Sequence, residues 1–256
     1  ARGMLAEGSL AVKRTKKTIF LKLAGWIGLF NNVIFHATTS SEADDIFKQF
    51  GKGAKVRIAP NLPGKNIENN LLSRTKEEGF VKLINIARIS PEKNLKLALK
   101  VLKEVKGNVI FDIYGTIYNT GYWDECLSLI NNMPSNIRIN YKESIERDKV
   151  QKLFQEYHFM FMPTTGENFG HVIFEALAAG CPVIISDQTP WRDLEKKQVG
   201  WDISLEDTGQ FVKVIEHCVE MQQDQYNTMS KSAHEFALEF IENNKAIDQN
   251  RKLFSV

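Results

Sequence analysis

Two hydrophobic periodicities alternate along the chain. Short apolar runs predict β-strands over 33–37, 55–59, 81–86, 109–114, 137–141, 159–162, 183–186 and 199–203. Between them, apolar residues spaced three and four apart predict helices over 9–30, 41–50, 95–105, 122–131, 145–154, 170–179, 205–221 and 225–240. This alternation is typical of an α/β fold, in which a Rossmann-like parallel sheet carries helices on both faces. Ligands of such folds bind beyond the carboxyl ends of the strands.

The alternation is interrupted once, at Pro60-Asn61-Leu62-Pro63-Gly64 and the polar stretch that follows it. We therefore expect two parts. Residues 1–62 would form the end of one α/β domain together with a linker, and residues 63–256 would form a larger α/β domain that includes the C-terminal helices.

The stretch 163–181 combines a strand end, a polar turn between glycines and a helix. A helix that starts near Gly170 directs unpaired N–H groups and its positive dipole end into the turn, where an anion such as phosphate can dock. Glu167 lies in the turn and Glu175 lies inside the helix, and their carboxylates could accept hydrogen bonds from sugar or ribose hydroxyls. The simpler alternative is a helix start with two solvated acids.

Three other loops follow strands at the same predicted sheet edge. Arg88 and Lys93 follow strand 81–86 and could neutralise a diphosphate, the alternative being a solvated pair of cations. Gly115 ends strand 109–114 with a backbone suited to close approach. Tyr141 ends strand 137–141 and could border a base or a ribose.

Composition narrows the function classes. The 256 residues are 43% hydrophobic and 25% charged, which is ordinary globular composition, and the net charge of +2 gives no reason to expect nucleic acid. The three cysteines have no paired spacing, so we expect neither a zinc site nor disulfides, and a cytoplasmic location. The sequence has no glycine-rich dinucleotide motif, no P-loop and no cluster of acids or histidines for a protein-bound metal.

The predicted helix 9–30 has an uneven charge. The first 22 residues hold six Lys or Arg against one acid, and large apolar residues and Trp26 follow them. Such a helix could lie on the inner face of an anionic plasma membrane as a peripheral contact. Alternatively, it packs on a protein core and keeps a solvated basic face.

The two acids and their surroundings resemble a known signature. Glu167 and Glu175 stand in the context Pro-Thr-x-Gly-Glu-Asn-Phe-Gly-His-Val-Ile-x-Glu-Ala-Leu-Ala-x-Gly-Cys-Pro-Val-Ile, which closely resembles the signature of glycosyltransferase family 4, retaining enzymes with the GT-B fold. Arg88 and Lys93 match that family's Arg-x-x-x-x-Lys motif. The turn at 187–191 resembles bacterial members that build capsular, lipopolysaccharide or exopolysaccharide chains.

The resemblance implies a role for each matching position. Arg88 and Lys93 would hold the donor diphosphate and stabilise it as the leaving group, Glu167 would hold the donor sugar, and Glu175 would hold the ribose. The departing phosphate would assist deprotonation of the acceptor, with neither a protein nucleophile nor a metal. The expected donor pocket is completed by Asn168, Phe169, Gly170, Gly115, Tyr141 and Thr165.

Two departures from the family pattern affect these expectations. Gly115 is followed by Thr-Ile-Tyr where the family frequently has a second glycine, which leaves the contacts of that loop undetermined. Residues 1–62 resemble only the last part of an N-terminal acceptor domain. The chain is therefore expected to be truncated and to lack most of the acceptor site.

The sequence favours one function and leaves two others open. The favoured function is transfer of a sugar, with retention, from a UDP- or GDP-linked donor to a glycan or lipid-linked acceptor in bacterial surface polysaccharide synthesis, without a cofactor. The alternatives are a non-catalytic nucleotide-sugar binding module and a GT-B-like nucleotide-sugar epimerase.

Overall fold

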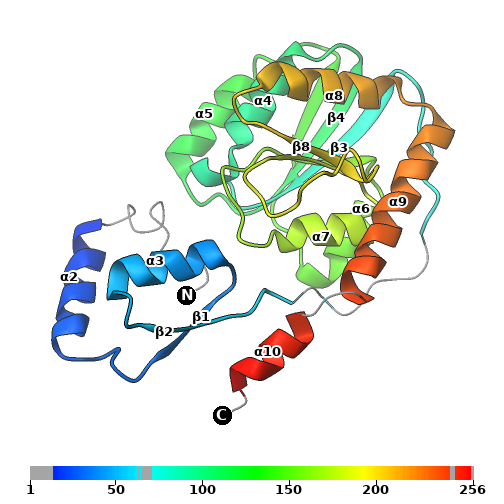
Figure 1. The fold of residues 1–256 in the computed structure, drawn as a ribbon. Coiled ribbons are helices and arrows are strands. Elements are labelled where there is room, and N and C mark those ends of the chain that lie inside the picture. Colours follow the sequence, from blue (N-terminus) through cyan, green and yellow to red (C-terminus); the bar gives the residue numbers. More distant parts are fainter. Residues whose placement is uncertain (1–13, 63, 65–70, 243–245, 255–256) are drawn as a thin grey trace. The chain divides into compact units, whose positions relative to one another are not determined.

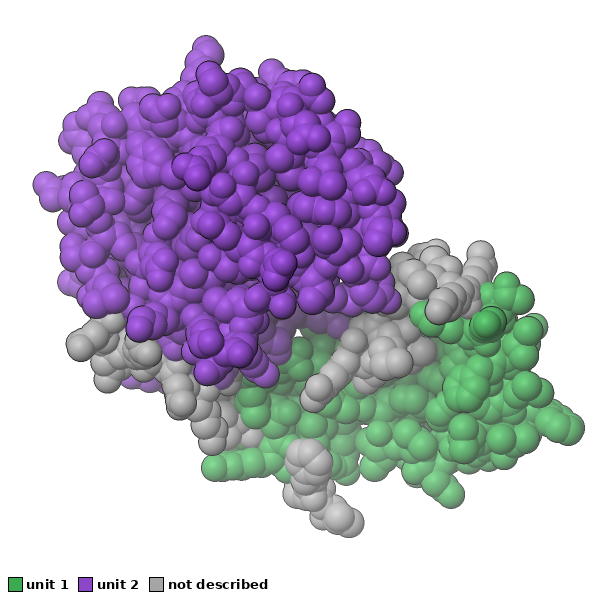
Figure 2. All heavy atoms as spheres, turned by 180° about the vertical axis from the view of Figure 1, so that it is seen from behind, with its two compact units in different colours: residues 1–62, 243–256 green, residues 63–242 purple. Residues whose placement is uncertain are grey.

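The chain divides into two compact units (Figure 1, Figure 2). The computed structural model describes residues 14–62, 64, 71–242 and 246–254. Unit 1 comprises residues 1–62 and 243–256, and unit 2 comprises residues 63–242. The sequence had assigned residues 243–256 to the larger domain, but their contacts group them with unit 1. Arg57 Nη1 donates to the carbonyl oxygens of Lys252 and Leu253, at 3.0 and 2.9 Å, and Asn250 Nδ2 donates to that of Pro60 at 2.8 Å.

Unit 2 is built on a six-stranded sheet in which every paired strand is parallel. The order across the sheet is β5-β4-β3-β6-β7-β8. The strands are β3 (Phe80–Ile86), β4 (Asn108–Tyr114), β5 (Ile137–Tyr141), β6 (Phe159–Met162), β7 (Val183–Ser186) and β8 (Gly200–Ile203). Every residue of β6 and β7 is buried, as is expected for central strands covered on both faces.

Helices cover both faces of this sheet (Figure 1). One face packs against α4 (Leu95–Glu104), α5 (Thr120–Ile130) and α8 (Thr208–Glu220), and the other against α6 (Val150–Phe154), α7 (His171–Ala178) and α9 (Gln223–Glu242). Side chains alternate along each strand, so Val109, Phe111 and Ile113 of β4 all enter the core on the α4 side. The expected fold class is confirmed.

The strand order reverses between β3 and β6. After β3 the chain builds outward through β4 and β5, and it then returns to place β6 on the other side of β3. Leu83 pairs with Phe159 and Ile84 with Met160 across this junction. The loops after β3 and β6 therefore meet at the reversal point of an open parallel sheet, where ligands of such folds bind.

The sequence located most of these elements, with two errors. A helix was expected over 145–154, but the structure has a 3-10 turn, Arg147–Lys149, followed by α6. Glu146 is extended, with φ −67° and ψ 141°, so the helix cannot continue back through it. The helix α10 (Ala246–Phe254) was not predicted at all.

Unit 1 contains a two-stranded parallel sheet, β1 (Ile34–Ala37) and β2 (Lys55–Ile58), with α2 (Arg14–Trp26) and α3 (Ser40–Phe50). Thr39 caps α3, because its side chain accepts the amide of Glu42 at 3.1 Å. Of the helix expected over 9–30, residues 9–13 lie outside the described residues, and the described helix ends at Trp26. The apolar side chains of α2 and the turn after it are largely exposed, among them Ile19, Phe20, Leu23, Trp26 and Ile27.

Candidate functional site

The loops that follow β3 and β6 are bonded into one structure through the backbone of Glu92. The Glu92 carbonyl oxygen accepts the Thr165 amide at 2.9 Å and the hydroxyls of Thr164 and Thr165, both at 3.1 Å. Asn94 Nδ2 adds a bond to the Pro163 carbonyl oxygen at 3.0 Å. The expected pocket residue Thr165 therefore holds the two loops together, and the loop with Arg88 and Lys93 is fixed against the turn with Glu167.

Lys93 and Glu167 form an ion pair across the reversal point, from Lys93 Nζ to Glu167 Oε1. Their side chains are only 18% and 15% exposed. The two residues are 74 positions apart in the sequence. An ion pair with so little exposure is screened less by salt than a surface pair, and each charge keeps its partner in place.

Arg88 lies in a more open environment. Its side chain is 55% exposed, and Nη2 lies 3.4 Å from Glu92 Oε1. The guanidinium carbon lies 5.1 Å from the centroid of the Tyr118 ring, which comes from the loop after β4. Arg88 is therefore held by one carboxylate and one aromatic face, while most of its surface remains accessible to an anion.

The start of α7 is shaped by Gly170. This residue has φ +74°, and a Cβ atom there would lie 2.8 Å from Ile173 Cδ1. Trp191 Nε1 donates to the Phe169 carbonyl oxygen at 2.6 Å and so fixes the peptide group between Phe169 and Gly170. Within the described residues, the amides of Asn168, Phe169 and Gly170 donate to no other protein group. These N–H groups lie at the positive end of the helix dipole, where an anion can bind.

The turn before α7 is supported by β7. Ser186 Oγ donates to the Thr164 carbonyl oxygen, and the Glu167 amide donates to the Gln188 carbonyl oxygen at 3.1 Å. Thr164 and Ser186 are fully buried. The turn is therefore anchored on β7 and on the loops that follow β3 and β7, which limits its freedom when a ligand binds.

Glu175 occupies a different environment from Glu167. It lies on α7 and is partly buried, and burial raises the pKa of its carboxyl above the usual range, although the charge of Arg147 opposes this. No hydrogen bond or ion pair within the described residues joins it to Glu167, Arg88 or Lys93. The two acids thus serve separate positions.

Gly115 is required where the loop after β4 passes the loop after β3. Its φ is +148°, and a Cβ atom there would lie 1.8 Å from the Ala87 carbonyl oxygen. The Gly115 amide donates to the Glu143 carbonyl oxygen at 2.6 Å, and Tyr141 Oη donates to the Gly115 carbonyl oxygen at 3.0 Å. Burial, followed by the charge of Glu143, raises the pKa of Tyr141. Tyr141 therefore fixes the Gly115 backbone.

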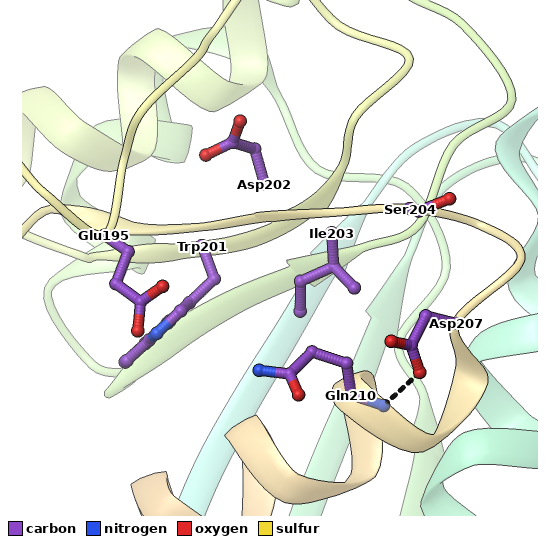
Figure 3. A pocket seen from close by; sticks show the side chains of 7 residues that line it. All are labelled: Glu195, Trp201, Asp202, Ile203, Ser204, Asp207 and Gln210. Carbon is purple, nitrogen blue, oxygen red and sulfur yellow. Dashed lines mark hydrogen bonds between the residues drawn. The ribbon is translucent and has the colours of Figure 1, made fainter.

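A pocket of about 220 Å³ lies beside β8 (Figure 3). Asp207 Oδ1 accepts the Gln210 amide at 2.9 Å and caps α8, and Asp202 accepts the amides of Asp193 and Leu194. The lining residues are Glu195, Trp201, Asp202, Ile203, Ser204, Asp207 and Gln210. None of the expected site residues lines this pocket, and two of its acids stabilise local backbone.

Sequence reasoning missed three residues of the site. Glu92 lies four positions after Arg88, but the residues between them form a loop and a short 3-10 turn, so this spacing did not indicate their pairing. Trp191 supports the turn through its indole N–H, and Tyr118 packs beside Arg88. Both depend on loops that are distant in sequence, so no local signal indicated them.

None of the described helices has the length and apolar character needed to cross a membrane. Within the same residues, no group of three or more His, Cys, Asp or Glu side chains is arranged to hold a metal ion.

Solved structures share this fold. A TarM variant from S. aureus, in complex with fondaparinux, alpha-GlcNAc-glycerol and UDP, matches with a TM-score of 0.66 and 16% identity over 86% of this chain and 43% of its own. WaaG, a glycosyltransferase of lipopolysaccharide biosynthesis, matches with a TM-score of 0.65 and 14% identity over 85% of this chain and 60% of its own. HepE from Anabaena, in complex with UDP and glucose, matches with a TM-score of 0.66 and 15% identity over 91% of this chain and 65% of its own.

At these identities the likeness shows the fold alone, which is that of GT-B glycosyltransferases. The chain spans 43% to 65% of the length of these three proteins. No curated protein sequence matches it. The family model described as glycosyl transferases group 1 matches residues 66–236, which is more than half of the chain. The chain therefore belongs to the group 1 glycosyl transferases.

Proposed function

We propose that this chain binds a nucleotide diphosphate sugar at the loops after β3, β4 and β6, as the donor-binding part of a retaining glycosyltransferase. The observation that carries the proposal is the bonding of two loops through Glu92. This bonding places Arg88 and Lys93 on the same structure as Glu167 and the start of α7. Two cations, the unpaired amides and the Glu167 carboxylate therefore lie on adjoining loops beyond the strand ends.

The diphosphate is the part of the ligand that this site fits best. Arg88 presents an exposed guanidinium, which can make forked contacts to phosphate oxygens, and Lys93 adds a compact charge. The amides of Asn168, Phe169 and Gly170 offer further donors at the start of α7. When the sugar is transferred, negative charge develops on the leaving diphosphate, and preorganised donors and cations stabilise that charge.

The two carboxylates suit the hydroxyl groups at either end of the donor. Glu167 is oriented by Lys93 and would accept hydrogen bonds from the sugar near its reacting carbon. Glu175 is partly buried on α7 and would accept the ribose hydroxyls. Replacing Glu175 by Ala should therefore weaken nucleotide binding, whereas Glu167→Ala should spare the bare nucleotide and impair use of the nucleotide sugar. Equal effects of both changes on bare UDP or GDP would contradict this division.

In the proposed reaction, the bond from the anomeric carbon to the diphosphate oxygen breaks, and a bond from that carbon to the acceptor oxygen forms on the same face. The acceptor proton passes to a phosphate oxygen of the leaving group. Three parts of this proposal rest on the family 4 resemblance. They are retention, independence of metal, and an acceptor that is a glycan or a lipid-linked glycan in bacterial surface polysaccharide synthesis. Retention is tested by NMR of the product's anomeric proton with a full-length protein that contains this chain, and an inverted product would contradict it.

The donor site is tested by calorimetric titration of the chain with UDP, GDP, ADP and CMP, with EDTA present. We expect one nucleoside diphosphate to bind, and we expect the double variant Arg88→Ala/Lys93→Ala to lose that binding. A matched control is Arg138→Ala/Lys103→Ala, which removes the same charges from two exposed positions on β5 and at the end of α4. Absence of binding to all four nucleotides, or equal loss in the control, would overturn the proposal.

Two alternative functions make different predictions. An epimerase would convert a nucleotide sugar to its epimer without an acceptor, which NMR of the sugar protons detects. A non-catalytic module would bind the donor, but a full-length protein containing this chain would transfer nothing.

The membrane contact proposed for residues 9–30 stays a prediction. Sedimentation with phosphatidylglycerol vesicles tests it, and the exposed basic and apolar side chains of α2 favour binding.

A further inference from the structure

The loop after β4 has a course that the family pattern does not explain. Its residues Thr116, Ile117 and Tyr118 stand where a second glycine is frequent, and they are bonded to the loop after β3 as a short parallel bridge, Ile89 with Ile117. The Ile89 amide donates to the Thr116 carbonyl oxygen at 2.9 Å, and the Tyr118 amide donates to the Ile89 carbonyl oxygen at 3.1 Å. The backbone of this bridge therefore fixes the position of residue 118 next to residue 88.

The Tyr118 ring remains exposed although its backbone is fixed. The residue is 67% exposed, and the Arg88 guanidinium carbon lies 5.1 Å from the ring centroid. An exposed aromatic ring gains little from burial, so packing alone does not explain its position. Among the described residues, the side-chain contact found for Tyr118 is the one with the Arg88 guanidinium.

The ring and the carboxylate beside Arg88 hold the guanidinium in different ways. Glu92 Oε1, at 3.4 Å from Nη2, engages a donor and offsets the positive charge. An aromatic face attracts the cation through its quadrupole and occupies none of the N–H donors. A guanidinium held by a ring therefore keeps its N–H groups and its charge for an incoming anion.

We propose that Tyr118 is a positioning residue, whose ring holds the Arg88 guanidinium where it contacts the donor diphosphate. This inference rests on the proposed donor site and goes beyond it. It gives a role to Tyr118 in the Thr-Ile-Tyr sequence, which stands where the family frequently has a second glycine. Arg88 loses less side-chain freedom on binding, because the ring already restricts it.

The test is a double-mutant cycle on affinity for UDP and GDP, measured by calorimetry on the whole chain. Tyr118→Leu keeps an apolar side chain without a quadrupole and should weaken diphosphate binding about two- to fivefold. Tyr118→Phe keeps the ring face and should bind as the wild type does. In an Arg88→Ala background, Tyr118→Leu should have no further effect, and uridine or guanosine binding should not change. Thermal unfolding of each variant shows whether it is folded.

Each outcome decides between the inference and the proposal on which it rests. Unchanged diphosphate affinity in Tyr118→Leu, or an equal loss in the Arg88→Ala background, overturns the positioning role and leaves the donor site standing. Loss in Tyr118→Phe equal to that in Tyr118→Leu also overturns it, because the hydroxyl would then be responsible. If the wild type binds none of UDP, GDP, ADP and CMP, the proposed function fails and the inference fails with it.

Discussion

His158 is expected to make the stability of unit 2 depend on pH. It precedes β6 and is 5% exposed. Nδ1 accepts the Lys82 amide at 3.0 Å, and Nε2 lies 2.9 Å from the Thr75 carbonyl oxygen, to which only a protonated nitrogen can donate. The neutral tautomer with hydrogen on Nε2 satisfies both bonds. A second proton on Nδ1 would face the N–H of Lys82, so the charged ring cannot keep this arrangement.

The size of this pH effect on stability follows from the lowered pKa of His158. Burial lowers the pKa of His158 from 6.5 to about 4; the Thr75 bond opposes this, and the charges of Lys76, Arg74 and Lys82 add to it. The unfolded chain therefore binds more protons than the folded chain between these two values. The neutral ring therefore stabilises the folded chain fully above pH 6.5, and this stabilisation is lost as the pH falls toward 4. Each unit of pKa difference corresponds to 1.36 kcal/mol, so the total loss in the free energy of unfolding is about 3 kcal/mol.

The assay is urea unfolding of the wild type and of His158→Gln at pH 7, 6 and 5. The variant should be less stable at pH 7, but the difference between the two proteins should shrink by about 2 kcal/mol on going to pH 5. Carboxylates titrate alike in both proteins and cancel in this difference. Val101→Ala, which removes buried apolar atoms of α4 without changing a titrating group, should show a difference that is constant with pH. A constant difference for His158→Gln would refute the reasoning.

Three further predictions concern the site. Gly115→Ala should destabilise unit 2 by at least about 2 kcal/mol, since neither the space nor the φ angle admits a Cβ atom, as thermal unfolding will show. Lys93→Met and Glu167→Gln should each lower the free energy of unfolding by about 1–2 kcal/mol, measured with urea. The double variant should lose less than the sum of the two single changes, because each single change leaves one little-exposed charge without its partner. As the pH falls toward the raised pKa of Glu175, affinity for UDP or GDP should fall in the wild type and stay flat in Glu175→Gln, by calorimetry.

Each of these has a control or a contradicting result. Gly121→Ala in the first turn of α5, where a Cβ atom meets only Asn119 Oδ1 at 3.6 Å, should be neutral or stabilising, and a loss equal to that of Gly115→Ala would contradict the steric argument. Additive costs in the Lys93 and Glu167 cycle would show that the ion pair contributes nothing. Parallel pH profiles for the wild type and Glu175→Gln would mean that another group controls binding.

The sequence by itself determined the elements and the location of the chemistry. The spacing of hydrophobic residues is a local property of the sequence, because the face of the strand or helix on which a side chain lies decides whether it is buried. The eight strands could therefore be located before any fold was known. In a parallel sheet the carboxyl ends of all strands meet at one edge. It follows that Arg88, Gly115, Tyr141 and Glu167, each placed at the end of a strand or after it, were expected at that edge.

Only the tertiary structure decided which of these residues meet. Lys93 pairs with Glu167 because β6 returns to lie beside β3, and strand order depends on how whole layers pack rather than on any local pattern. The same holds for Tyr118, which reaches Arg88 through backbone bonds between two loops, and for α10, whose carbonyl groups accept from Arg57 in unit 1. Local periodicity encodes burial, whereas pairs distant in sequence depend on the folded arrangement of the whole unit.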